Sequence, residues 1–371
     1  MRILVTGANG FLGWHTRLRL AAERTHEVIT VTRENWPELG ELLPYVDAVI
    51  HLAGVNRAAS DRDVEEGNVQ LAVELAASIA STTKPLKVVM SGTIHDEKDT
   101  PYGRGKRRAR DLLSEATHAS GGHFVSVCLP NLFGEHAVPH YNSFVATFID
   151  CTISGEVPVV NDNLVELLHA QDAAQAIIEA LDSRQDLTRP KGEQHRVASV
   201  WGLLQEIHGA YYPVGEFPDL SSKFRIDMFN SYRAALFPDH YPISLVPHSD
   251  SRGSFVETVR CRGGEGQSSF SSTAVDVTRG DHYHLSKVER FAVIRGEARI
   301  SIRRMFHERI YDFYVSGDAP VAIDMPVGWV HNITNIGDDV LFTQFWSHDL
   351  FRPEAPDTYT EPVRAVRGEL F

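Results

Sequence analysis

The chain has 371 residues and a formal net charge of −13, which argues against nucleic acid as its main partner. Its composition, 43% hydrophobic and 23% charged, is typical of globular domains, and the length predicts two of them. Three widely spaced cysteines without a CxxC pair predict reduced thiols in a cytoplasmic protein. No apolar run approaches the roughly 20 residues of a membrane span, so no membrane partner is expected.

The chain begins with a pattern typical of dinucleotide binding. Residues 3–5 are apolar without alternation, which indicates a central parallel strand, and a helix is predicted over residues 15–22. Between them lies a GxxGxxG turn, whose glycines allow a tight exit from the strand, approach of the backbone to a pyrophosphate, and close packing of helix on strand. The cofactor-binding residues expected from this turn are Gly7, Gly10, Phe11, Leu12 and Gly13.

Further apolar segments extend the same plan. Strands are predicted at residues 27–31, 48–53, 86–90 and 124–129, alternating with helices. This pattern predicts a doubly wound, Rossmann-like parallel sheet with both faces covered. Arg33, just after the second strand, suits the 2′-phosphate of NADP, although Glu34 beside it leaves NAD open and Arg33 could also be a solvated loop cation.

A proton donor is predicted at the start of a later helix. Pro101 is a helix start signal, and the spacing of four between Tyr102 and Lys106 places both side chains on one helix face. The ammonium of Lys106 is expected to lower the pKa of the Tyr102 phenol and to bind the nicotinamide ribose, so that Tyr102 can protonate a carbonyl being reduced. Thr93, which ends the preceding strand, is expected to hydrogen-bond the same carbonyl oxygen, with Ser91 as the alternative.

Over residues 1–240 the chain resembles the extended short-chain dehydrogenase/reductase family, on its GxxGxxG turn, on residues 51–54 and 131–134, on Asn68, and on the hydroxyl, Tyr and Lys pattern. The resemblance implies that Thr93, Tyr102 and Lys106 are catalytic. It also places Leu52, Ala53 and Gly54 along the cofactor, and Asn131 near a nucleotide-sugar. A polar cluster that includes Tyr141 and Asn142 is a candidate substrate loop, and we expect both residues to bind substrate. The family commonly has three consecutive hydroxyl residues before the Tyr, whereas Gly92 interrupts them here.

The pattern changes in the C-terminal part. Pro238 and Pro242 break off the helical pattern of residues 225–236, and short alternating segments punctuated by Gly, Pro and Asp follow. They predict an all-β sandwich or barrel. We therefore expect an NADP-binding domain at residues 1–242 and a metal-binding domain at residues 243–371.

Four ligand-type residues gather in this second part: His282, His284, Glu289 and His331. Alternate residues of a strand face one side, so the first two imidazoles are expected to point the same way. Three imidazoles and a carboxylate suit Zn²⁺, and also Fe²⁺, Mn²⁺ or Ni²⁺. The spacing of these residues, with Gly296, Pro326, Gly328 and Asn335, resembles the two motifs of the cupin family, which implies a jelly-roll β-barrel.

Residues 250–257 and 279–283 also resemble sugar-nucleotide 3,5-epimerases of the dTDP-dehydrorhamnose type. In those enzymes the His that matches His282 removes a proton beside a ketone, generally without a metal. Two assignments therefore stay open. In the first, which we favour, all four residues are ligands; in the second, His282 is a base and the other three hold the metal.

The order of the two halves resembles the bifunctional enzymes of capsular polysaccharide synthesis over the full length. Local matches lie at residues 51–57, 101–103, 130–134, 141–143, 315–318, 326–328 and 356–359. The resemblance implies epimerisation at C3 of a UDP-2-acetamido-2,6-dideoxy-4-hexulose by the cupin, then NADPH-dependent reduction of the C4 ketone to UDP-N-acetyl-L-talosamine. It also implies a homodimer. Epimerisation must come first, because reduction removes the ketone that acidifies the C3 proton.

Two other classes of function compete with this one. One is a sugar-nucleotide reductase with a single activity, whose cupin is only a scaffold. The other is a non-enzymatic NADP-binding sensor, which would need neither Tyr102 nor Lys106. A 4,6-dehydratase is disfavoured, because no Asp-Glu pair stands beside Thr93.

Overall fold

The computed structural model describes residues 1–96 and 98–364. These residues form two compact units, one of residues 1–147 with 161–197 and the other of residues 148–160 with those from 198 onward. The predicted limit at residues 242 and 243 lies between α8 (Lys223–Leu236) and β11 (Ile243–Ser244), and this division stays a prediction. By compactness, however, α8 belongs with the strands that follow.

The first unit contains a parallel sheet of six strands in the order β2-β1-β3-β4-β5-β8. Its strands are β1 (Arg2–Thr6), β2 (Glu27–Val31), β3 (Ala48–His51), β4 (Lys87–Thr93), β5 (His123–Leu129) and β8 (Leu187–Thr188). The central strands are buried on both faces, as their continuous apolar runs require. The predicted doubly wound sheet is confirmed.

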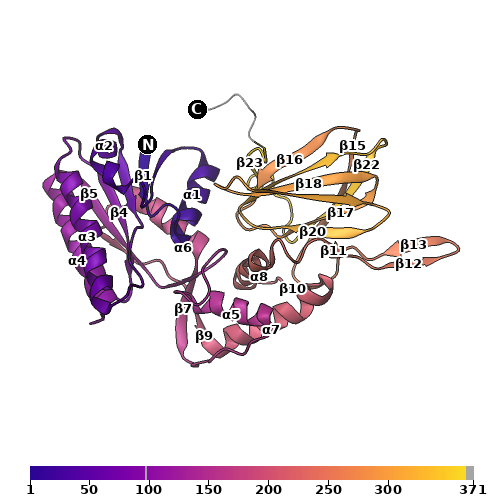
Figure 1. Ribbon diagram of the computed structural model, residues 1–371, viewed down its shortest axis with the longest axis horizontal. Helices are drawn as coiled ribbons and strands as arrows, with labels where there is room; N and C mark the ends of the chain where they lie inside the picture. The colour runs from indigo at the N-terminus through magenta and orange to yellow at the C-terminus, as the bar shows by residue number, and fades with distance from the viewer. Residues whose placement is uncertain (97, 365–371) are drawn as a thin grey trace. The chain divides into compact units, whose positions relative to one another are not determined.

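Helices cover both faces of this sheet (Figure 1). Ile3 packs with residues of α1 and α6 on one face, whereas Leu4 packs with residues of α3 and α4 on the other, because successive side chains of a strand point to opposite sides. The helices of the unit are α1 (Phe11–Glu23), α2 (Leu39–Leu42), α3 (Asp61–Ala80), α4 (Pro101–Ala119) and α6 (Ala170–Glu179). A smaller sheet pairs β6 (Asn131–Phe133), β7 (Leu164–His169) and β9 (Glu193–Arg196).

The second unit contains two antiparallel sheets of five strands each, which confirms the predicted all-β fold and fits a cupin. One has the order β11-β20-β17-β22-β15, with β20 (Val321–Met325), β17 (Glu289–Arg295), β22 (Leu341–Ser347) and β15 (Gln267–Thr273). The other has the order β19-β18-β21-β16-β23, with β19 (Ile310–Ser316), β18 (Glu297–Arg304), β21 (Trp329–Asn335), β16 (Thr278–Tyr283) and β23 (Tyr359–Thr360). Phe291 of β17 lies edge-on against His331 of β21, with ring centroids 5.6 Å apart, so the sheets pack face to face at this point.

Helices and short strands complete the second unit. They are α5 (Phe144–Ser154) and α7 (Val197–Val214), most of whose residues belong to it, the hairpin of β12 (Pro247–Asp250) and β13 (Gly253–Val256), and the pair of β10 (Phe217–Asp219) and β14 (Cys261–Gly263). A buried ion pair joins neighbouring strands, since Arg290 Nε on β17 donates to Asp324 Oδ1 on β20 over 2.6 Å. Tyr211 of α7 donates its hydroxyl to the same carboxylate over 2.5 Å, which fixes α7 on this sheet. Within the described part of the chain, no helix is long and apolar enough to cross a membrane.

Candidate functional site

The strand order of the first unit indicates where a ligand would bind. β2 and β3 lie on opposite sides of β1, so the order reverses there, and a ligand crevice is expected outside the carboxyl ends of β1 and β3. Gly7 follows β1 with φ +66°, and a Cβ added to it would lie 2.7 Å from the backbone nitrogen of Ala53, just beyond β3. Only glycine allows the two chain segments to approach this closely.

The turn then leads directly into α1. Gly10 is the N-cap residue, and Phe11 and Leu12 form the first turn of the helix, partly buried. A Cβ at Gly13 would lie 2.2 Å from the carbonyl oxygen of Gly7, so the helix can pack against the turn only without a side chain there. The helix N-terminus thus begins at the crevice, where its free N–H groups can bind a phosphate.

Arg33 lies two residues beyond β2 and is exposed, as is Glu34. The hydroxyl of Thr32 donates to the Glu34 carboxylate, and the N–H of Thr32 donates to Asn35 Oδ1 over 2.7 Å. These contacts order the turn after β2 that carries Arg33. The role of Arg33 in binding the 2′-phosphate of NADP stays a prediction.

Lys106 lies on α4 and is buried beside the end of β3. A Cβ added to Gly54 would lie 4.0 Å from Lys106 Nζ and 3.1 Å from Asn68 Oδ1. Burial lowers the pKa of Lys106 to about 8, and burial together with the Lys106 charge lowers the pKa of His51 to about 3. The structure therefore brings Lys106 to Gly54, two residues that the sequence separates widely.

Tyr102 lies in the first turn of α4, where Thr100 caps the helix by accepting the N–H of Gly103 over 3.1 Å. Burial raises the pKa of Tyr102 to about 12, which is opposite to the predicted lowering by Lys106. The reason is that the buried phenolate would lose its water, and this cost dominates. A phenol with so high a pKa keeps its proton at neutral pH, as a proton donor must.

The two hydroxyl candidates lie at the carboxyl end of β4. Thr93 is its last residue and accepts the N–H of His95 through Oγ1 over 3.2 Å. Ser91 donates its hydroxyl to the carbonyl oxygen of His51 over 3.4 Å and is thereby turned toward β3. Both are largely buried, and the choice of Thr93 stays a prediction.

The predicted substrate residues lie on two segments. Asn131 begins β6 and donates to the carbonyl oxygen of Glu166 over 3.2 Å. Tyr141 and Asn142 are exposed in the segment before α5. Arg57, a few residues beyond β3, lies over the Tyr141 ring at 5.6 Å and donates to the carbonyl oxygen of His140 over 3.1 Å. These contacts tie the candidate substrate loop to the chain segment after β3.

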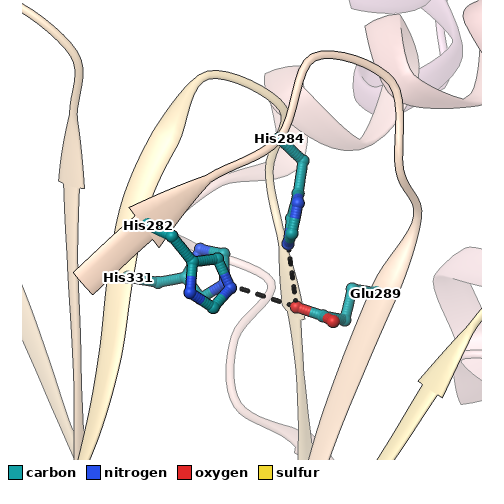
Figure 2. Close-up of side chains that lie close together, drawn as sticks. All are labelled: His282, His284, Glu289 and His331. Carbon is teal, nitrogen blue, oxygen red and sulfur yellow. Dashed lines mark hydrogen bonds and ion pairs between the residues drawn. The ribbon is translucent and has the colours of Figure 1, made fainter. Parts of the chain in front are cut away.

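In the second unit, the four predicted metal ligands come together between the two sheets (Figure 2). His282 pairs with His331 across β16 and β21, His284 follows β16, and Glu289 begins β17 of the opposite sheet. One ligand atom from each lies within 4.8 Å of the others. Glu289 Oε2 is 3.1 Å from His284 Nε2 and 3.3 Å from His331 Nε2.

Backbone carbonyls orient two of the imidazoles. His284 Nδ1 donates to the carbonyl oxygen of Asp357 over 2.5 Å, and His331 Nδ1 donates to that of Trp329 over 3.1 Å. In the neutral tautomer the Nε2 lone pairs then face the Glu289 carboxylate, so acceptors converge on one point. Lone pairs that face one another in this way repel, and a cation bound between the Nε2 atoms and the carboxylate would remove the repulsion. The donor set therefore fits a divalent metal ion.

The surroundings of the cluster favour an ionised Glu289 and a neutral His282, the protonation states in which these groups can bind a metal. Although burial opposes it, the positive charge and donated hydrogen bonds that His284 and His331 supply when protonated, a role that a bound cation would take over, hold the pKa of Glu289 well below its ordinary value. Burial and the two neighbouring imidazoles lower the pKa of His282 to about 3, so its ring is neutral at physiological pH. A neutral imidazole can bind a metal or accept a proton, and both assignments of His282 remain predictions.

Sequence reasoning did not assign two residues that support these sites. Asn68 accepts the N–H of Val55 over 3.2 Å and donates to the Val55 carbonyl over 2.7 Å, which fixes the chain beside Lys106. Asp357 contacts both His284 and the segment that follows it. Asn68 belongs to the resemblance to the short-chain family, and Asp357 to the segment 356–359 that resembles the capsule enzymes. The partners of Asn68 lie 13 residues away in the sequence and those of Asp357 lie 72 and 73 away, so no local pattern could have revealed these contacts.

Residues 3–192 match the NAD dependent epimerase/dehydratase family, and residues 248–359 match the polysaccharide biosynthesis C-terminal domain. The chain is 32% identical over 373 residues to a UDP-2-acetamido-2,6-beta-L-arabino-hexul-4-ose reductase of Pseudomonas aeruginosa, with 97% of this chain and 98% of that protein covered. The crystal structure of the capsular polysaccharide assembling protein CapF from Staphylococcus aureus matches with a TM-score of 0.59 and 30% identity, covering 98% of this chain and 100% of that one. The spore coat polysaccharide biosynthesis protein SpsL of Bacillus subtilis is 25% identical over 122 residues, 30% of this chain and 81% of that protein.

Proposed function

The chain belongs to the NAD dependent epimerase/dehydratase family, and on this premise we propose that it is a bifunctional UDP-sugar enzyme of cell-surface polysaccharide synthesis. Its second unit epimerises C3 of a UDP-2-acetamido-2,6-dideoxy-4-hexulose. Its first unit then reduces the C4 ketone with NADPH, giving UDP-N-acetyl-L-talosamine on the route to UDP-N-acetyl-L-fucosamine. The observation that carries the proposal is the presence in one chain of a half-buried Tyr102, four residues before the buried Lys106 on α4, and of a three-His, one-Glu cluster.

The cluster suits proton abstraction beside a ketone. The C4 carbonyl acidifies the C3 proton, and a divalent ion, which we propose to be zinc, supplies positive charge that stabilises the enolate when bound. His284 and His331 are buried, whereas His282 and Glu289 are partly exposed. The proposal takes all four as ligands, with His282 as the base in the alternative. The C3 proton is lost to solvent through a base, which is His282 in the alternative assignment, and a solvent proton added to the other face of C3 inverts it.

The first unit suits hydride transfer. The reduced nicotinamide supplies the hydride to C4 when bound, and Tyr102 donates the proton to the C4 oxygen. Thr93 hydrogen-bonds the same oxygen, and the Lys106 ammonium holds the ribose. Leu52, Ala53 and Gly54 border the cofactor, and Asn131, Tyr141 and Asn142 contact the nucleotide-sugar. A homodimer and a cytoplasmic location complete the proposal.

The test follows both reactions separately. With the 4-ketosugar in D₂O and no NADPH, we expect deuterium to enter C3, seen as loss of the C3 proton signal by NMR. On adding NADPH, we expect one equivalent to be oxidised for each talosamine product formed. A reductase with a scaffold cupin would oxidise NADPH without prior exchange, and an NADP-binding sensor would do neither.

Cofactor choice gives a further prediction at Arg33. Replacing Arg33 with Ala should raise the KM for NADPH by about ten- to hundred-fold, because a charge-assisted hydrogen bond to the 2′-phosphate is lost. The KM for NADH should stay nearly constant, since NADH lacks that phosphate. Steady-state kinetics with both cofactors measure the change, with the exposed Arg62→Ala as the matched control. Equal effects on both cofactors would show that Arg33 does not read the 2′-phosphate.

A further inference from the structure

The short loop between β16 and β17 sets the distance between two ligands of the proposed metal centre, His284 and Glu289. His284 is the first residue of this loop, residues 285–288 follow, and Glu289 begins β17 directly after them. Any movement of this loop changes the distance between these two ligands. What holds the loop therefore decides whether the cluster is formed before an ion arrives.

A single carboxylate accepts three of the four backbone N–H groups of residues 285–288, and the fourth, of Val288, donates to His348 Nδ1 over 3.0 Å. Asp357 Oδ1 accepts the N–H of Leu285 over 2.8 Å, and Asp357 Oδ2 accepts those of Ser286 and Lys287 over 3.0 and 2.9 Å. The hydroxyl of Ser286 also donates to Oδ2 over 3.0 Å. Hydrogen bonds to an ionised acceptor are shorter and stronger than neutral ones, and successive N–H groups form a concave site for an anion.

The same residue also orients a ligand ring. The backbone carbonyl of Asp357 accepts from His284 Nδ1 over 2.5 Å, and this leaves Nε2 facing Glu289 Oε2 at 3.1 Å. Asp357 is itself held in place, because Tyr359, two residues later, pairs with Tyr283 of β16. One residue thus fixes both the loop and the tautomer of the imidazole at its start.

The opposite side of the loop is held by α8. Asn230 Nδ2 donates to the carbonyl oxygen of Ser286 over 2.7 Å, and Arg233 Nη2 donates to that of Lys287 over 3.0 Å. Arg233 also donates through Nη1 to the carbonyl oxygen of Met325 over 2.6 Å. Both side chains are buried, so the loop is clamped between α8 and Asp357.

We propose that Asp357 is a positioning residue of the second unit, which presets the span from His284 to Glu289 so that the ligand cluster forms before the ion binds. This rests on the proposed metal site. It gives a physical role to the segment at residues 356–359, which matched the capsule enzymes in sequence but supplies no ligand.

The test uses the full-length protein stripped of metal and titrated with Co²⁺, whose visible absorption reports coordination geometry. We expect Asp357→Ala to bind Co²⁺ about ten- to hundred-fold more weakly, the usual cost of losing an outer-shell partner of a metal ligand. Its spectrum should also change, because the His284–Glu289 span is no longer fixed. Asp357→Asn should lie between Asp357→Ala and wild type, since the amide oxygen keeps one acceptor. The exposed Asp338→Asn, a control for the lost charge, should match wild type.

The outcomes separate the two proposals. If wild type binds Co²⁺ and both Asp357 variants match it in affinity and spectrum, the positioning role is wrong and the metal site stands. If wild type binds no Co²⁺, the metal site itself is wrong and the positioning role falls with it. Should Asp357→Ala fail to fold by circular dichroism, Asp357→Asn decides, because it preserves the size of the side chain.

Discussion

Replacing His331 with Ala should strongly slow C3 epimerisation while the reductase continues to work. His331 is fully buried between the two sheets, and its Nε2 lies 3.3 Å from Glu289 Oε2. Without it, the enolate loses the charge that stabilises it, and we expect deuterium exchange at C3 to fall by about 10²- to 10³-fold. The measurement is the NMR exchange rate without NADPH, together with the metal content of the purified variant.

The same variant distinguishes the bifunctional enzyme from a reductase with a scaffold cupin. Supplied with sugar already epimerised at C3, His331→Ala should oxidise NADPH at close to the wild-type rate, because Tyr102 and Lys106 belong to the other compact unit. The exposed His248→Ala is the matched control. If His331→Ala converts the original ketosugar to the same product as wild type, the second unit has no catalytic part in the reaction.

Replacing Tyr102 with Phe should have the opposite effect. The hydroxyl is the proposed proton donor, and general acid catalysis of this kind contributes roughly 10²- to 10⁴-fold. We expect NADPH oxidation to fall by about this factor, whereas the affinity for NADPH and the exchange at C3 should persist. Stopped-flow absorbance, fluorescence titration of NADPH and NMR exchange measure the three quantities.

The exposed Tyr45→Phe is the control for loss of a tyrosine hydroxyl in the same unit. Since burial raises the pKa of Tyr102 to about 12, its phenol should remain protonated throughout the neutral range. The wild-type rate should then show no loss of the Tyr102 proton in the neutral range, and a fall in rate above about pH 8 would report deprotonation of Lys106, whose pKa is lowered to about 8 by burial. A Tyr102→Phe variant with nearly full reductase activity would move the proton donor to another group, with Thr93 and Lys106 the first to be tested.

Much of the fold is predictable from local patterns. The continuous apolar runs at β1 to β5 and the alternating segments of the second unit predict the strands, because burial on two faces or one face leaves different periods in the sequence. The GxxGxxG turn is also local: Gly7, Gly10 and Gly13 act within a single strand–turn–helix. Sequence spacing likewise identified the four members of the His/Glu cluster.

Contacts between segments that are distant in the sequence needed the tertiary structure. Glu289 reaches the cluster from the sheet opposite His282 and His331, and Lys106 reaches Gly54 across the end of β3. Similarly, only packing joins Asp357 to His284. The predicted lowering of the Tyr102 pKa was wrong, because burial depends on everything packed around the ring.

The sequence by itself therefore determined the elements, the family resemblance and the chemical type of each site, because these depend on residue identity and short spacing. The tertiary structure decided which side chains share a site, which tautomers they adopt, and that α8 packs with the β-sheets instead of the reductase unit. The physical reason is that distances, burial and hydrogen bonds between remote segments arise from the packing of the whole chain, which no local pattern encodes.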